Sequence, residues 1–164
     1  MKVVSTSNAP AAIGPYSQAI DLGNMVFVSG QIPVDSATGK MADTVEEQAA
    51  QSLANLKAIL AEAGLSMANV VKTVIFLADI NDFAAVNAVY AKAFAEPFPA
   101  RSCVQVAAIP KGAKLEIECI AVQQALQAEN GNQKRAAERL GISRTTLWRM
   151  LQREAPNSAQ KSGI

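Results

Sequence analysis

Two runs of strand-forming residues lie in the stretch Pro97-Phe-Pro-Ala-Arg101-Ser-Cys103-Val-Gln-Val-Ala-Ala-Ile-Pro110-Lys-Gly-Ala-Lys-Leu-Glu116-Ile-Glu118-Cys119-Ile120. Pro110-Lys111-Gly112 separates them, and such a break between apolar, β-branched runs predicts two strands joined by a turn. Arg101 and Cys103 are two residues apart in the first run, so they share one face of a strand.

The second run places Glu116 and Glu118 on one face in the same way. Arg101 offers a planar fork of donors that suits a carboxylate or a phosphate, and a Glu is able to hold or activate a water. One interpretation is that a cation, a thiol and a carboxylate gather around one cleft. The other is a surface ion pair beside a small buried Cys103. Spacing alone favours the second, because charged strand residues usually face solvent.

Length and charge indicate a domain of ordinary size, or a smaller domain with an appendage. The chain has 164 residues, of which 50% are hydrophobic, so it can bury a core. Its net charge is only +1, but residues 1–123 hold 8 Lys+Arg and 11 Asp+Glu, whereas residues 124–164 hold 7 and 3. A basic end on an acidic body predicts two modules with different partners.

The sequence contains no His and only two Cys. Catalysis by imidazole and a His-ligated metal are therefore excluded, and two Cys alone make a poor zinc site, so no metal is expected. Two Cys without a secretion signal predict a reducing, cytoplasmic location. The longest apolar runs, such as Val74–Ala78, are too short to span a membrane, so no membrane partner is expected.

Strands and a first helix are predicted in the body of the chain. Thr44-x-x-Glu47 is a capping box that begins a helix with one apolar face, and Gly64 is a natural end for it. Apolar runs bounded by Gly, Pro and Asn predict four further strands, at residues 2–5, 17–22, 25–33 and 70–77.

A second helix is predicted to begin at Asn81-Asp82 and to end before Pro97. Asn87 is a poor helix former in its middle, and the simplest interpretation places it on an exposed polar face. Two helices with one apolar face each fit a mixed sheet that is covered on one side, an α+β fold. The inward residues of the second helix are Phe83, Val86, Tyr90 and Phe94.

The other face of the sheet has no helix left to cover it. Ser29-Gly30 in the third strand lets a backbone or a ligand come close, or simply marks a bulge. Association of several copies is the simplest way to hide an open apolar face from water. The residues that indicate an apolar character for this face are Val26, Val28, Val104 and Val106.

Six motifs follow one another in the first 123 residues: Ala9–Gln18, Ser29–Pro33, Val71–Thr73, Asp82–Asn87, Phe98–Cys103 and Lys114–Glu118. Together they resemble the RidA/YjgF family. The resemblance implies a chorismate-mutase-like α+β fold and a homotrimer whose sheets meet in a central barrel, with clefts between subunits. It also implies hydrolysis of 2-imino and enamine acids, such as 2-iminobutyrate and 2-iminopropionate, to 2-keto acids and ammonia without metal or cofactor.

The same resemblance implies a role for individual residues. Arg101 would bind the substrate carboxylate and Glu116 would position the water. An imine is already electrophilic, so orientation and a placed water are the help that it needs. Nothing marks Cys103 as a nucleophile, and it either tunes the site or packs. The segment before Phe98 is slightly shorter than is usual for the family. The residues that would line the cleft are Tyr16, Ser29, Gly30, Asn87 and Cys103.

Residues 124–155 are predicted to form a helix-turn-helix, after a body that ends near residue 123 and before a disordered end at 156–164. Short helices are expected at 123–129, 133–140 and 144–153, with Ser143 capping the last. Two short helices around a Gly-containing turn are typical of this motif, whose second helix enters the major groove of double-stranded DNA. A basic hairpin that docks on a protein is equally compatible. The residues expected inward are Ala136, Ala137, Leu140, Leu147 and Leu151.

Gly131-Asn-Gln-x-x-Ala136-Ala137-x-x-Leu140-Gly-Ile-Ser143-Arg144-x-Thr146-Leu-Trp148-Arg149-x-Leu151 is similar to the Fis-type helix-turn-helix at the C-terminus of bacterial enhancer-binding regulators. Trp148 departs from the polar or Tyr residue more usual there, and would pack on the body or a partner. By this resemblance the residues that face DNA are Ser143, Arg144, Thr146 and Arg149.

Three functions fit these observations. The first is an imine deaminase that carries a DNA-binding tail, and the presence of both Arg101 and Glu116 favours it. The second is a transcription regulator whose body binds a small 2-keto or imino acid without useful turnover. The third is an inert trimeric scaffold for the tails. Fis-type units pair across two-fold axes, so two trimers are expected to meet tail to tail as a hexamer.

Overall fold

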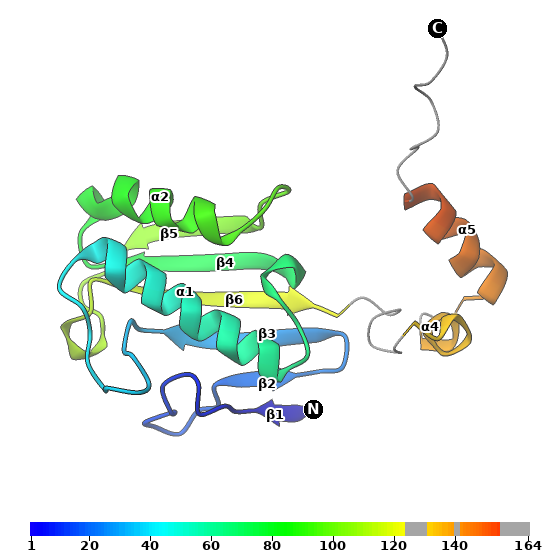
Figure 1. Cartoon of the computed structure of the whole chain (residues 1–164), viewed down its shortest axis with the longest axis horizontal. Helices are drawn as coiled ribbons and strands as arrows, with labels where there is room; N and C mark the ends of the chain where they lie inside the picture. Colours follow the sequence, from blue (N-terminus) through cyan, green and yellow to red (C-terminus); the bar gives the residue numbers. More distant parts are fainter. Residues whose placement is uncertain (124–130, 140–141, 155–164) are drawn as a thin grey trace, which may run out of the picture. The chain divides into compact units, whose positions relative to one another are not determined.

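The computed structural model describes residues 1–123, 131–139 and 142–154 (Figure 1). The chain divides into two compact units, Met1–Gln123 and Gln124–Ile164. The first unit is built on one sheet, and the second contains the two short helices α4 and α5.

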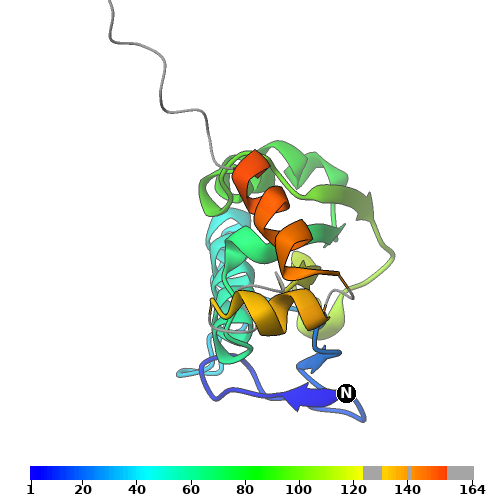
Figure 2. The ribbon, with the colours of Figure 1, turned by 90° about the vertical axis from the view of Figure 1, so that its right-hand side faces the viewer.

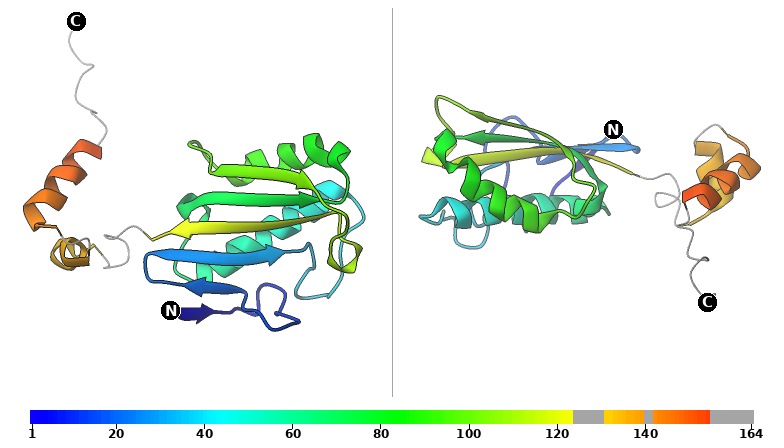
Figure 3. Two further views of the ribbon diagram at one scale, coloured as in Figure 1. Left: turned by 180° about the vertical axis from the view of Figure 1, so that it is seen from behind. Right: turned by 90° about the horizontal axis from the view of Figure 1, so that it is seen from above.

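A six-stranded mixed sheet forms the first unit. All neighbouring strands are antiparallel except β4 and β5, which are parallel. Both long helices lie on one face of the sheet, as the view from above in Figure 3 shows. The predicted α+β fold is thereby confirmed. The strands, in spatial order, are β1 (Lys2–Val4), β2 (Ala19–Asp21), β3 (Met25–Gln31), β6 (Leu115–Val122), β4 (Val70–Leu77) and β5 (Ala100–Gln105).

The prediction that β5 and β6 are joined by a simple turn is wrong, because β4 lies between them. Residues 106–114 instead cross the end of β4. The Val106 amide donates to the Leu77 carbonyl, and the Ala78 amide donates to the Lys114 carbonyl. The break in the sequence is a short 3-10 helix, η3 (Pro110–Gly112). A local pattern marks such a break but does not show which distant strand fills the gap.

Helix α1 (Val45–Glu62) has the predicted ends. The Thr44 hydroxyl oxygen accepts from the Glu47 amide at 3.3 Å, which caps the helix as predicted, and the hydroxyl donates to the Glu47 carboxylate at 2.7 Å, where a capping box would have the Thr44 backbone amide as the donor. Gly64 follows the helix with φ of +74°, a conformation that favours glycine. The apolar side of α1 is fully buried in the core that it shares with the sheet, through Leu56, Ile59 and Leu60.

Helix α2 (Phe83–Ala93) follows a single 3-10 turn, η2 (Ile80–Asp82). Val86 and Tyr90 are buried as predicted, and so is Phe94 just after the helix. Phe83 was expected inward but is 39% exposed. As the first residue of the helix it lies at the edge of the core, where periodicity no longer ensures burial.

The two faces of the sheet differ from the prediction in one respect. Val26 and Val28 are buried on the helix-covered face, since they pair with Ala121 and Cys119. Alternation then places Phe27, which is 41% exposed, on the other side. We call that side the open sheet face. Val104 lies there as expected, and Glu116 and Glu118 lie on the same face as the partners of Phe76 and Val74. The apolar residues of the open sheet face are Phe27, Val74, Phe76, Val104 and Ile120.

The second unit contains α4 (Gln133–Arg139) and α5 (Arg144–Glu154), which lie against each other at a steep angle (Figure 2). Ala136, Ala137 and Leu147 form its small core with Ile142 packed against them, as predicted for three of these residues. Ser143 caps α5, because its hydroxyl oxygen accepts from the Thr146 amide at 3.1 Å. The expected helix at 123–129, the side chains of Leu140 and Leu151, and the end at 156–164 fall outside the described residues, apart from Gln123, which follows β6.

None of the described helices combines the length and the apolar character that crossing a membrane requires.

Candidate active site

Arg101 lies on the helix-covered face of β5, and α2 holds its guanidinium group. Its Nη1 donates to Oδ1 of Asn87 at 2.7 Å, so Asn87 is partly buried and paired rather than on a free polar face. The guanidinium carbon lies 4.8 Å from the centre of the Tyr90 ring and 5.6 Å from that of Phe83. Both distances are in the range of cation–π attraction.

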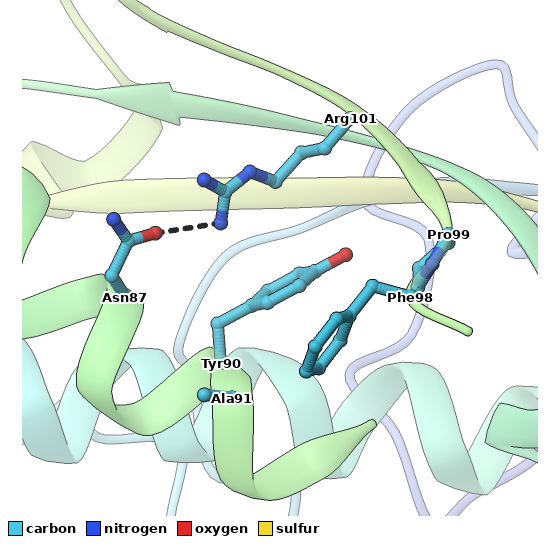
Figure 4. Close-up of a pocket in the computed structure, with 6 residues that line it drawn as sticks. All are labelled: Asn87, Tyr90, Ala91, Phe98, Pro99 and Arg101. Atoms are coloured by element: carbon cyan, nitrogen blue, oxygen red, sulfur yellow. Dashed lines mark hydrogen bonds between the residues drawn. The ribbon is translucent and has the colours of Figure 1, made fainter. Parts of the chain in front are cut away.

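A cavity of about 440 Å³ opens beside this arginine, and we call it the arginine pocket (Figure 4). In Figure 4 the guanidinium group lies over the Tyr90 ring while Phe98 borders the cavity from the other end. The polar side chains of the lining are few, and the rest is apolar, which suits a small molecule with one anionic group. The lining consists of Asn87, Tyr90, Ala91, Phe98, Pro99 and Arg101.

Glu116 lies on the opposite face of the sheet. It pairs with Phe76 of β4, whereas Arg101 pairs with Thr73, which is fully buried under the helices. A second cavity of about 350 Å³ opens here, and we call it the glutamate pocket. Its lining consists of Ile13, Tyr16, Ser29, Gly30, Ile32, Pro110 and Glu116.

Gly30 is required by the position of Glu116. A Cβ atom added at Gly30 would overlap Oε1 of Glu116 and would lie 2.7 Å from its Cδ. The pairing of β3 with β6 is also irregular between Val28 and Gln31. The expected close approach at Ser29-Gly30 is therefore present, together with a bulge, and the group that approaches is the carboxyl of Glu116.

The pKa of the Glu116 carboxyl is raised above its ordinary value. Burial is the larger cause, because it disfavours the charged form, and the negative charge of Glu118 adds to it. A carboxyl of this kind gains and loses a proton closer to neutral pH than a free Glu does. Such a group is suited to passing a proton to and from a water.

The other expected residues of the glutamate pocket are held in different ways. The Ser29 hydroxyl donates to the Ser17 carbonyl at 2.7 Å, so it fixes the loop that carries Tyr16. The Tyr16 side chain is 50% exposed and lies at the rim of the pocket. Sequence reasoning missed Ile13, Ile32 and Pro110 here.

Cys103 lies two residues after Arg101 on the same face and packs against the hydrophobic core. Burial raises the pKa of its thiol, and the nearby positive charge of Arg101 offsets this only in part. Cys119, which is 3% exposed, has its pKa raised to about 12, also through burial. Both thiols are therefore protonated near neutral pH, and a protonated thiol is a poor nucleophile.

Within one chain, the cation and the carboxylate do not share a cleft. The arginine pocket and the glutamate pocket have no lining residue in common and open on opposite faces of the sheet. The first interpretation drawn from spacing is wrong for a single chain, because register places Arg101 and Glu116 on different faces. Sequence reasoning also missed Phe98 as a wall of the arginine pocket, and the contacts of Phe83 and Tyr90 with Arg101.

In the second unit, the four residues expected to face DNA are all exposed. The hydroxyls of Ser143 and Thr146 lie 2.9 Å apart and bond to each other, which holds the start of α5. Trp148 is 53% exposed on the same helix. The exposed basic residues of this helix, within the described side chains, are Arg144 and Arg149.

A protein-family model described as Endoribonuclease L-PSP matches residues 6–123, which contain both pockets. The chain belongs to this family, the RidA/YjgF family. A second model, described as Bacterial regulatory protein, Fis family, matches residues 115–153. The resemblance to both families that the sequence indicated is thereby confirmed. The start of the second match coincides with β6 of the sheet.

Two relatives of this chain are named as deaminases. The chain is 58% identical over 125 residues to 2-iminobutanoate/2-iminopropanoate deaminase of Salmonella typhimurium (strain LT2), which covers 74% of this chain and 98% of the relative. The Escherichia coli (strain K12) protein of that name is 57% identical with the same coverage. The crystal structure of E. coli TdcF with bound serine has a TM-score of 0.73 and 53% identity, and covers 75% of this chain and 99% of TdcF.

Proposed function

We propose that this RidA/YjgF protein hydrolyses 2-imino and enamine acids to 2-keto acids and ammonia, in sites that two copies of the chain complete together. The identity to two deaminases over nearly their whole length supports the reaction. The observation that carries the shared site is the separation of Arg101 and Glu116 into two pockets on opposite faces. Each pocket holds half of the groups that the reaction needs.

Arg101 binds the carboxylate of the imino acid in this proposal. Asn87 already occupies Nη1 of the guanidinium group, so the remaining donors are left for the substrate. The apolar walls at Ala91 and Phe98 accept the side chain of a small imino acid. A fixed carboxylate places the C=N carbon at a defined distance from the opposite wall of the shared site.

Glu116 acts on the water. It accepts a proton from the water as the water oxygen bonds to the imine carbon, and the imine nitrogen takes up a proton from solvent as the C=N double bond becomes single. In the resulting carbinolamine the nitrogen receives the proton that Glu116 returns, and the C–N bond breaks with its electron pair leaving on ammonia. The hydroxyl group releases its proton to solvent as its oxygen becomes the carbonyl of the 2-keto acid. The raised pKa of Glu116 suits both steps, because the group must accept and donate in one cycle.

The open sheet face supports the association that the shared site requires. Phe27 and Val104 are 41% and 45% exposed there, and a sheet with such a face needs a cover. Three sheets that meet in a central barrel, as the family resemblance implies, bury this face and bring the glutamate pocket of one copy near the arginine pocket of the next.

Mixing two inactive variants tests the shared site. Arg101→Ala and Glu116→Gln are each assayed alone for 2-iminobutyrate hydrolysis, and then after they have been unfolded and refolded together. Mixed assemblies contain sites in which one copy supplies Arg101 and its neighbour supplies Glu116, so activity returns. If the mixture stays as inactive as its components while native mass spectrometry shows mixed assemblies, the shared site is wrong. If the unmodified protein has no activity, the deaminase function is wrong.

A second function, binding of double-stranded DNA, is supported by the Fis-family match and by the exposed Arg144 and Arg149. Electrophoretic shift of a set of DNA duplexes tests it. Arg149→Ala is expected to weaken binding about tenfold, whereas Lys134→Ala, which removes the same charge from the exposed side of α4, serves as the control. An unshifted duplex at high protein concentration contradicts this function.

A regulator that binds its ligand without turnover is the alternative, and measurable hydrolysis by the unmodified protein excludes it.

Paired Fis-type units on a three-fold body would produce a hexamer of two trimers. Light scattering of the full chain and of residues 1–123 over a range of concentrations tests this. A full chain that stays trimeric at high concentration contradicts tail pairing.

A further inference from the structure

Three residues of α2 contact the Arg101 guanidinium group, and they lie in one line along the helix. Phe83, Asn87 and Tyr90 are spaced i, i+4 and i+7, so their side chains follow one stripe of the helix surface. Asn87 accepts from Nη1, and the two aromatic rings lie 5.6 and 4.8 Å from the guanidinium carbon. The guanidinium group of Arg101 thus lies against this stripe of α2.

Tyr90 is itself fixed by neighbours on two sides. Its hydroxyl lies 2.8 Å from Oγ1 of Thr73, a fully buried residue of β4, and its ring lies 4.5 Å from that of Phe94. Thr73 is also the register partner of Arg101 in the parallel pair β4–β5. The ring under the arginine is therefore tied to the strand beside it, and the distance from ring to guanidinium is set by the sheet.

Core packing does not account for Phe83. The side chain is 39% exposed and is not part of the buried cluster, so its burial contributes little to stability. The described contact that it does make is with the Arg101 guanidinium group. An aromatic ring at this position has a use if the arginine has to be held in one orientation.

We propose that Phe83 and Tyr90 are positioning residues for imine hydrolysis, which hold the Arg101 guanidinium group flat so that its free donors face the substrate carboxylate. The proposal rests on the proposed function, since it takes Arg101 as the carboxylate-binding group. A free arginine side chain loses rotamer entropy when it binds a ligand, and a group that is already oriented loses less of it.

The kinetic test uses three variants and one control. Phe83→Leu lowers kcat/KM for 2-iminobutyrate about two- to fivefold, and Tyr90→Leu lowers it about tenfold or more, mainly through KM because the carboxylate contact exists before and during the reaction. Tyr90→Phe keeps the ring but loses the hydroxyl bond to Thr73, so KM rises less than in Tyr90→Leu. Ile80→Ala, which changes a 45% exposed apolar residue one turn before the helix, leaves both constants unchanged.

A second measurement does not depend on turnover. The side-chain Nε–Hε signal of Arg101 is observed by NMR and assigned through its loss in Arg101→Lys. In the unmodified protein and in Tyr90→Phe this signal is displaced by the rings, and in Phe83→Leu and Tyr90→Leu it moves toward the position of a free arginine. This arm still reports on the orientation of Arg101 if the protein proves to have no deaminase activity.

The proposal is overturned if Phe83→Leu changes neither KM nor the Arg101 signal, since that exposed position can be altered without loss of the fold. It is also overturned if a folded Tyr90→Leu loses kcat alone and leaves KM and the signal unchanged. Should Tyr90→Leu fail to fold, Phe83→Leu decides by the same two readouts.

Discussion

The arginine pocket and the glutamate pocket fix their charged groups by different means. Arg101 is held by side chains of its own chain, with one hydrogen bond and two aromatic rings from α2. The Glu116 carboxyl fits against the backbone of β3 because Gly30 has no side chain there. Burial and the charge of Glu118 disfavour its ionised form. One pocket is thus ready to bind an anion in the isolated chain, while the other has a carboxyl suited to exchanging protons.

The largest expected effect comes from the arginine pocket. Arg101→Ala is expected to lower kcat/KM for 2-iminobutyrate by about 10³-fold, because two charge-assisted hydrogen bonds of about 1.5–3 kcal/mol each are lost. Arg101→Lys is also expected to be poor, since a point charge does not replace a bidentate fork. Circular dichroism serves as the control for folding. Near-normal turnover by a folded Arg101→Ala would remove Arg101 from the site.

Gly30→Ala should break the glutamate pocket without touching its carboxyl group. The added methyl overlaps the Glu116 carboxyl, which must move, so kcat is expected to fall about 10- to 100-fold while binding of the product 2-oxobutyrate to Arg101 is retained. Gly39→Ala is a suitable control, because that turn glycine has open space around it, although its φ of +71° makes the change mildly destabilising. Equal losses of kcat and product binding would show that Gly30 matters for the fold rather than for Glu116.

Removing the neighbouring charge sharpens the comparison through pH. Glu118 raises the pKa of Glu116, so Glu118→Gln lowers it. Hydrolysis needs the ionised base, and a lower pKa keeps that form present at lower pH, so the acid limb of the kcat/KM profile moves to lower pH. A limb that keeps its place would mean that another group controls the acid side of the profile.

Cys103 should matter least. Its thiol is protonated near neutral pH and packs against the core, so Cys103→Ala is expected to keep activity within about threefold and to cost about 1 kcal/mol of stability. Steady-state kinetics and thermal unfolding measure the two quantities. A loss of more than about a hundredfold in a folded variant would instead assign a reactive role to the sulfur.

Features that depend on local sequence were predictable. The helix cap at Thr44, the end of α1 at Gly64 and the cap at Ser143 each depend on contacts within a few residues. The order of the strands was not predictable in this way. The place of β4 between β5 and β6 depends on pairing with two strands that lie much further along the chain. The exposure of Phe83 was not predictable from the helical spacing either, because Phe83 is the first residue of α2 and lies at the edge of the core.

The residues of the candidate site came from the family resemblance, but their arrangement depends on register. Glu116 alternates with the buried Leu115 and Ile117, so the sequence of β6 already contained the information that it faces away from the helices. The strand of Arg101 has no such clear alternation, because polar and apolar residues mix on both of its faces. Its side therefore became known only from its pairing with Thr73.

Trp148 is the only tryptophan of the chain, and it is 53% exposed on α5. Its fluorescence consequently reports on the second unit alone, since the first unit contains no indole. An indole in water emits at longer wavelength than one that is covered by a partner, so docking of α5 on DNA or on another protein would shift or quench the emission. The protein thus carries its own optical label, placed on the one helix whose partner is still to be identified.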